Sequence, residues 1–205
     1  KELKYSSNEG YTDENNTIYL QSLLNHQYPT EQLNKDMLRM YDDNIVRFTN
    51  EISEDREERI TWKYFQYLSL LFTEVYLDKY FSNKAKLLAE LNQYVKEFND
   101  KQVERTYFKG KNNKKVFIAQ PFTFDALNKL AFWNATGSGK TLIMHINIKQ
   151  YMHYAEKYNL KDKNKVLLIT PNEGLSKQHI EEFKLSNIQA NIFNKDAPSM
   201  FSGKE

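Results

Sequence analysis

Residues 135–141 are the part of the sequence whose residue types and spacing point most directly to chemistry. Glycines in such a turn let backbone N–H groups approach a polyphosphate where a Cβ would clash. The lysine supplies a charge for the β- and γ-phosphates, and the threonine hydroxyl is a ligand for Mg²⁺. The stretch therefore predicts a P-loop that binds ATP and Mg²⁺, formed by Ala135, Thr136, Gly137, Ser138, Gly139, Lys140 and Thr141, with Thr141 as the metal ligand.

The P-loop departs from the general pattern at one position. A glycine is usual six residues before the lysine, and this chain has Asn134 there. Asparagine is the non-glycine residue that best tolerates unusual backbone angles, so we expect the loop to form. The alternative interpretation is a chance Gly-Lys-Thr at the start of a helix.

A second motif follows about 25 residues after Thr141. The apolar run 166–169 ends in Thr170-Pro171 and turns into a polar segment that contains Gln178. This run resembles motif Ia of superfamily 2 helicases, and the P-loop resembles their motif I. Together with residues 124–133, these stretches resemble the DEAD/DEAH-like helicase subunit (Res) of type III and related restriction systems, over roughly residues 120–193.

The resemblance implies an ATP-dependent DNA helicase or translocase from a bacterial restriction or phage-defence system. It implies DNA as a partner, and a DNA methyltransferase (modification) subunit as a further one. The implied contacts with the nucleic-acid backbone are Thr170, Pro171, Asn172 and Gln178, and Gln120 is a candidate for reading adenine. The alternatives are that Asn172 only caps the next helix and that Gln120 is an ordinary loop residue.

The elements that must position these residues indicate an α/β fold. Residues 1–104 are expected to be a helical N-terminal region, with apolar stripes over 33–45, 62–80 and 87–98 and helix starts at Thr30, Ser53 and Ser82. Residues 105–205 are expected to be the first part of a RecA-like ATP-binding domain with a parallel sheet. Its expected elements are a hairpin (106–108 and 116–118), strands at 131–134, 166–170 and 188–193, and helices at 140–157 and 175–185.

Hydrolysis of ATP needs an acid that holds Mg²⁺ and orients water. The only Asp-Glu pair is Asp13-Glu14, in a polar N-terminal segment, so no catalytic residue is assigned. We expect the chain to be an N-terminal piece of a longer motor, without its initiator Met and truncated before motif II, that binds ATP without hydrolysing it. Glu182-Phe183-Lys184 fits a nuclease motif by its letters but is expected on a solvated helix face.

Composition adds limits rather than a function. The net charge is +2, so any nucleic-acid-binding face must be a local patch. The absence of cysteine excludes disulfides and Cys-ligated zinc, and fits a cytoplasmic protein. No apolar run is long enough for a membrane helix. His26, His145, His153 and His179 show no metal-ligand spacing, and we expect His145 and His153 to be packing or surface residues.

Two other functions remain open on the sequence alone. One is a P-loop ATPase of another branch, such as an AAA+ or partition-type protein, which would place its Walker B and sensor residues differently. The other is a nucleotide-binding interaction module that recruits partners through its helices and never turns over ATP.

Overall fold

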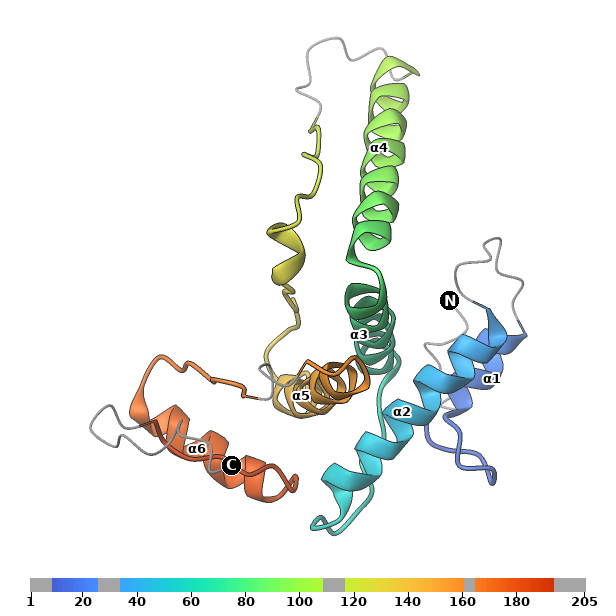
Figure 1. The fold of residues 1–205 in the computed structure, drawn as a ribbon. Helices are drawn as coiled ribbons and strands as arrows, with labels where there is room; N and C mark the ends of the chain where they lie inside the picture. The colour runs from blue at the N-terminus through green and yellow to red at the C-terminus, as the bar shows by residue number, and fades with distance from the viewer. Residues whose placement is uncertain (1–8, 26–33, 109–116, 161–164, 194–205) are drawn as a thin grey trace. The chain divides into compact units, whose positions relative to one another are not determined.

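The computed structural model describes residues 9–25, 34–108, 117–160 and 165–193. These residues form six α-helices and one short 3₁₀ helix (Figure 1). The elements are α1 (Ile18–Leu24), α2 (Lys35–Ser53), α3 (Tyr64–Ser82), α4 (Lys84–Phe108), η3 (Ala126–Asn128), α5 (Lys140–Lys157) and α6 (Glu173–Lys184). The chain divides into two compact units, Lys1–Glu74 with Ala135–Glu205 and Val75–Asn134, and the division falls within α3.

Short polar side chains set the starts of the helices. Asn34 caps α2, because its side chain accepts a hydrogen bond from the N–H of Met37 at 2.8 Å. Asn83 does the same for α4 through the N–H of Lys86 at 2.9 Å. The predicted starts at Ser82 and Ser53 are wrong, because these residues end α3 and α2. The start predicted at Thr30 lies outside the described residues.

The core of the first unit is built around α2, which contacts both α1 and α5. Apolar side chains of both α2 and α5 are fully buried in this core, among them Tyr41, Ile45, Ile52, Ile143 and Ile146. Each such side chain contributes roughly 1.5–3 kcal/mol on burial. This packing gives α5, the helix that follows the predicted P-loop, a rigid support.

A buried carboxylate joins three helices of the same unit. Asp42 on α2 accepts hydrogen bonds from the N–H of Thr17 at 2.9 Å and from the hydroxyl of Tyr67 on α3 at 2.7 Å. The Thr17 hydroxyl also donates to it. Burial raises the pKa of Asp42, and these hydrogen bonds oppose that rise. The start of α1 is therefore tied to α2 and α3.

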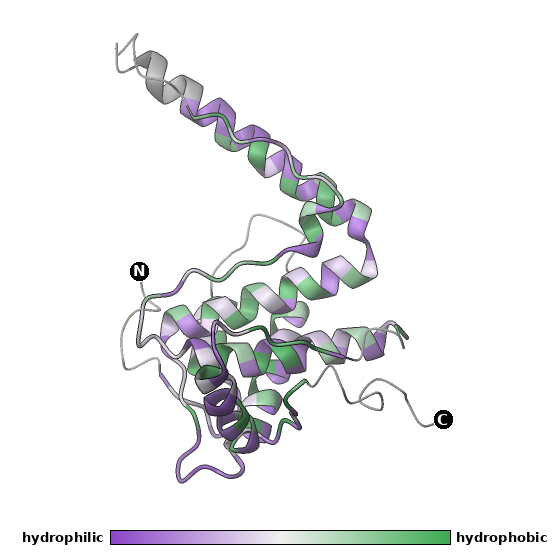
Figure 2. Ribbon diagram, turned by 90° about the vertical axis from the view of Figure 1, so that its left-hand side faces the viewer, coloured by the Kyte–Doolittle hydropathy of each residue, from purple (hydrophilic) through white to green (hydrophobic). Residues whose placement is uncertain are grey.

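In the second unit an extended segment, residues 117–125, runs back along α4 (Figures 1 and 2). The carboxamide of Asn99 donates to the carbonyl of Ala119 at 3.0 Å and accepts from its N–H at 2.9 Å. Asn92, two turns earlier, pairs in the same way with Phe122, at 3.1 and 2.7 Å. The predicted hairpin strand at 106–108 is wrong, since α4 continues through Phe108. The turn of that hairpin lies outside the described residues.

The expected α/β fold, with its RecA-like parallel sheet, is wrong for the described residues, which are all-α and contain no β-strand. The single β-bridge among them joins Tyr11 and Thr17. Residues 131–134, 166–170 and 188–193 are extended but form no ladder, and Trp133, Leu167 and Ile169 are 101%, 65% and 83% exposed. Apolar β-type composition predicted strands, but a strand also needs a neighbour to accept its hydrogen bonds. None of the described helices has the length and apolarity to cross a membrane.

Candidate phosphate-binding site

Residues 135–139, named here the glycine loop, lead directly into α5. Gly137 and Gly139 have φ angles of 76° and 74°, in the left-handed region that side chains with a Cβ rarely adopt. Gly139 is the N-cap of α5 and makes no side-chain capping bond, and the first helical bond of α5 runs from the N–H of Ile143 to the Gly139 carbonyl at 3.1 Å. The positive end of the α5 dipole therefore lies at the loop.

Lys140 folds back over the glycine loop. Its Nζ donates to the carbonyl of Ala135 at 2.8 Å, and the N–H of Ser138 bonds to the same oxygen at 3.3 Å. The loop is thereby closed into a tight ring with an ammonium group on it. A helix N-terminus with an adjacent cation suits an anionic group such as a phosphate.

The remaining predicted loop residues lie in sequence order around this ring. Ala135, Thr136 and Gly137 are exposed, and Thr141 is partly exposed in the first turn of α5. Among the described residues, no group of three or more His, Asp or Glu side chains is placed to hold a metal ion. Thr141 as a Mg²⁺ ligand stays a prediction.

A glutamine that the sequence reasoning missed contacts the glycine loop. Gln66, in the first turn of α3, donates from Nε2 to the carbonyl of Ser138 at 2.9 Å. A Cβ built on Gly139 would lie 2.5 Å from this same Nε2. No local sequence signal could have found Gln66, because it precedes Ser138 by 72 positions and belongs to no motif.

Two further polar contacts hold α5 against α3. The carboxamide of Gln150 donates to the Leu70 carbonyl at 3.0 Å, and the hydroxyl of Tyr154 donates to Glu74 at 2.7 Å. Gln150, Tyr154 and Glu74 are fully buried. Buried hydrogen bonds of this kind are costly to break, so they fix the position of α5.

His145 joins α5 to the turn after α6. It is fully buried, with Nδ1 2.8 Å from the hydroxyl of Ser186, which also accepts from Arg56 at 2.9 Å. Burial lowers the pKa of His145 to about 4, and the nearby Arg56, His179 and Lys149 act in the same direction. The packing role expected for His145 is confirmed.

The second motif forms the start of α6. Asn172 caps this helix, since its side chain accepts from the N–H of Leu175 at 2.9 Å. The hydroxyl of Thr170 donates to the Asn172 carbonyl at 3.0 Å and lies 2.6 Å from the hydroxyl of Ser176. Pro171 and Gln178 are exposed. The capping role of Asn172 is confirmed, while contacts from Thr170, Pro171, Asn172 and Gln178 to nucleic acid stay a prediction.

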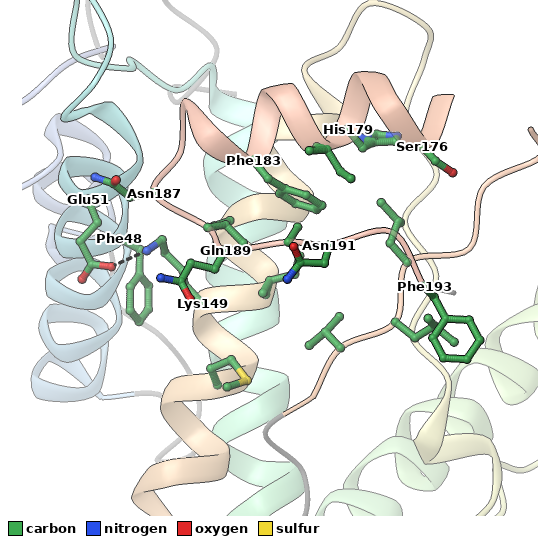
Figure 3. Close-up of a pocket in the computed structure, with 18 of the residues that line it drawn as sticks. Phe48, Glu51, Lys149, Ser176, His179, Phe183, Asn187, Gln189, Asn191 and Phe193 are labelled. Carbon is green, nitrogen blue, oxygen red and sulfur yellow. Dashed lines mark hydrogen bonds and ion pairs between the residues drawn. The ribbon is translucent and has the colours of Figure 1, made fainter. Parts of the chain in front are cut away.

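A cavity of about 690 Å³ lies beside this motif. It is lined by α2, α5, α6 and the extended segments at 166–168 and 187–193, and Thr170 and Ser176 lie at its wall. Figure 3 shows His179 and Phe183 reaching toward it from α6, and the ion pair between Lys149 and Glu51 at 2.8 Å on another side. The glycine loop is not part of its lining.

Two other candidates lie elsewhere. Gln120 belongs to the second unit, where it is exposed in the extended segment that is hydrogen-bonded to Asn92 and Asn99. Its recognition of adenine stays a prediction. The nuclease-like letters at 182–184 lie on α6, where Glu182 forms an ion pair with Arg56 at 3.7 Å. Phe183 packs against the ring of His145, with centroids 4.7 Å apart.

The family comparison covers the glycine loop, α5 and the second motif. The profile described as "Type III restriction enzyme, res subunit" matches residues 89–204, more than half of the chain. Proteins of this kind are superfamily 2 helicases. The chain belongs to the family of type III restriction enzyme res subunits. No curated protein and no solved structure matches it significantly.

Proposed function

We propose that the glycine loop, Lys140 and Thr141 bind the phosphates of ATP with Mg²⁺. The carrying observation is the ring that Lys140 closes on the carbonyl of Ala135 at the N-terminus of α5. Two glycines with positive φ form this ring, and backbone N–H groups, a helix dipole and an ammonium group then converge on one anion. Thr141 supplies the hydroxyl that would ligate Mg²⁺ beside the phosphate oxygens.

The wider proposal follows from the family. The chain is the ATP-binding portion of an ATP-dependent DNA helicase or translocase of a restriction system, it works in the cytoplasm, and DNA and a modification subunit are its partners. Within 205 residues it holds ATP without cleaving it. The single Asp-Glu pair of the sequence, Asp13-Glu14, supports this claim because it is exposed in the turn before α1 and does not follow a strand among the described residues. A hydrogen bond from the N–H of Asn15 to the Thr12 carbonyl closes that turn.

The test is binding of a fluorescent ATP analogue to the Lys140→Ala variant, with Lys35→Ala as its control. Lys35 is an exposed lysine in the first turn of α2, so its removal takes away the same charge elsewhere. Lys140→Ala should abolish binding and Lys35→Ala should leave it unchanged. An affinity that Lys140→Ala leaves intact would contradict the ATP site. ATP turnover that depends on Lys140 would contradict the claim that this chain holds ATP without cleaving it.

A further inference from the structure

A side chain in the first turn of α3 contacts the glycine loop. Gln66 makes two hydrogen bonds at once: its Oε1 accepts from the N–H of Lys63 at 2.8 Å, and its Nε2 donates to the carbonyl of Ser138 at 2.9 Å. The first bond satisfies a backbone donor at the start of α3. The second reaches across to the loop, so one carboxamide fixes both elements.

The bond to Ser138 orients a specific peptide group. The described residues contain no cis peptide, so the Ser138 carbonyl and the Gly139 N–H point to opposite sides of one planar unit. Holding the carbonyl on the α3 side therefore turns the Gly139 N–H away from α3. Gly139 is also the N-cap of α5, where backbone N–H groups meet an anion.

The close approach of the two residues depends on glycine. With any Cβ at position 139, the distance to Gln66 Nε2 would be 2.5 Å, shorter than real contacts allow. The absence of a side chain at Gly139 thus serves the contact with α3 as well as the backbone angle. Gln66 also precedes the matched residues 89–204, so the family match does not include it.

We propose that Gln66 is a positioning residue of the phosphate site, which holds the Ser138–Gly139 peptide so that its N–H is presented to a phosphate. The proposal rests on the binding of ATP by the glycine loop. It gives the helices before residue 89 a part in nucleotide binding, because a movement of α3 would turn this peptide.

Two substitutions of Gln66 test this positioning role in the 205-residue chain. They share the loss of the donor to Ser138 but differ in charge and in the bond to Lys63. Gln66→Glu keeps an acceptor for Lys63 and suits a helix N-terminus, but cannot donate to Ser138. Gln66→Met is uncharged and similar in shape, but makes neither bond. Both lose the donor to Ser138, and that loss should weaken binding of the fluorescent ATP analogue roughly tenfold. Matched controls are Gln21→Glu and Gln21→Met, at an exposed glutamine of α1.

Two readouts separate positioning from a general loss of structure. Inorganic tripolyphosphate has no base and serves as a competitor for the site. The Gln66 variants should lose affinity for tripolyphosphate by the same factor as they lose affinity for the ATP analogue. The thermal unfolding midpoint of Gln66→Glu should stay at or above that of the unmodified chain. Wild-type affinity in either Gln66 variant, or equal losses in the Gln21 controls, would overturn the proposal. If Lys140→Ala abolishes binding while both Gln66 variants bind normally, the ATP site stands and the role of Gln66 alone fails.

Discussion

The Nδ1 of His145 lies 2.8 Å from the hydroxyl of Ser186, which ties the middle of α5 to the turn that ends α6. The same hydroxyl accepts a hydrogen bond from Arg56, just beyond the end of α2. The consecutive helices α5 and α6 are thus joined at one buried point to α2, which lies far from them in the sequence. The ionisation of His145 therefore bears on the stability of the unit that contains the glycine loop.

Acid should destabilise the protein through His145. Its pKa is lowered from 6.5 to about 4 in the fold, so the unfolded chain binds a proton at a higher pH than the folded one. The stability from neutral His145 is complete above about pH 6.5 and is lost as the pH falls toward 4. We expect a loss of about 2 kcal/mol at most, measured by urea unfolding at pH 7.5, 6 and 5.

The control for this prediction is His145→Gln, which does not titrate but can still bond to Ser186. It should flatten the fall in stability between pH 6.5 and 4.5. The charged and titratable groups near the ring, Arg56, His179 and Lys149, stay in place in this variant. An equally steep fall in the variant would assign the pH dependence to other groups.

Alanine at the two loop glycines should separate backbone strain from steric collision. Gly137 and Gly139 have nearly equal positive φ angles, but a Cβ at Gly137 meets nothing within 4 Å, whereas one at Gly139 meets Gln66. Gly137→Ala should cost about 1 kcal/mol from strain alone. Gly139→Ala should cost slightly more, because the flexible Gln66 side chain must shift and its bond to the Ser138 carbonyl is weakened.

A double-mutant cycle identifies the source of that extra cost. In a Gln66→Ala background, the difference between Gly139→Ala and Gly137→Ala should shrink toward zero, as judged by chemical denaturation. If the difference persists without the Gln66 side chain, the collision is not its cause.

The extended segment along α4 should open when its asparagines are removed. Asn99→Ala deletes both hydrogen bonds to Ala119, so amide hydrogen exchange at Ala119 should accelerate several-fold, as for a loss of about 1 kcal/mol. The amide of Phe122, which Asn92 holds, should change less. Gln93→Ala, an exposed substitution on the same helix, is the control and should leave Ala119 unaffected. Equal acceleration in Gln93→Ala would refute a local role for Asn99.

The sequence predicted best where local chemistry decides the structure. The bounds of α5 follow from the glycines before Lys140 and the apolar residues after it, and the expected helix at 140–157 is confirmed. The capping of α6 by Asn172, which was the alternative interpretation of that residue, is likewise a matter of local chemistry. The helix at 62–80 was also recognised, but its expected start at Ser53 was wrong. Ser53 is the last residue of α2, where its hydroxyl donates to the Thr49 carbonyl, and α3 begins at Tyr64.

The sequence predicted worst where structure depends on a distant partner. The run 166–169 has strand-like composition, but composition does not supply the neighbour that a ladder requires, and Ile169 is 83% exposed. The bond of Gln66 to Ser138 spans 72 positions, and nothing near Gln66 marks it. The glycine loop itself could be found from its letters, whereas its support from α3 could not.

The pairing of Asn92 and Asn99 with Phe122 and Ala119 has a metric consequence. The asparagines are seven positions apart on a helix, and their partners are three positions apart on an extended chain. A helix rises about 1.5 Å per residue and an extended chain about 3.3 Å per residue, so both spans are about 10 Å long. Each asparagine therefore lies opposite its own backbone partner. Adding or deleting one residue between Ala119 and Phe122 would move one backbone partner away from its asparagine and break that pair of hydrogen bonds. Replacing Gln120 or Pro121 with another residue would leave both pairs of hydrogen bonds in place. The number of residues in this span is thus more tightly constrained than their identity.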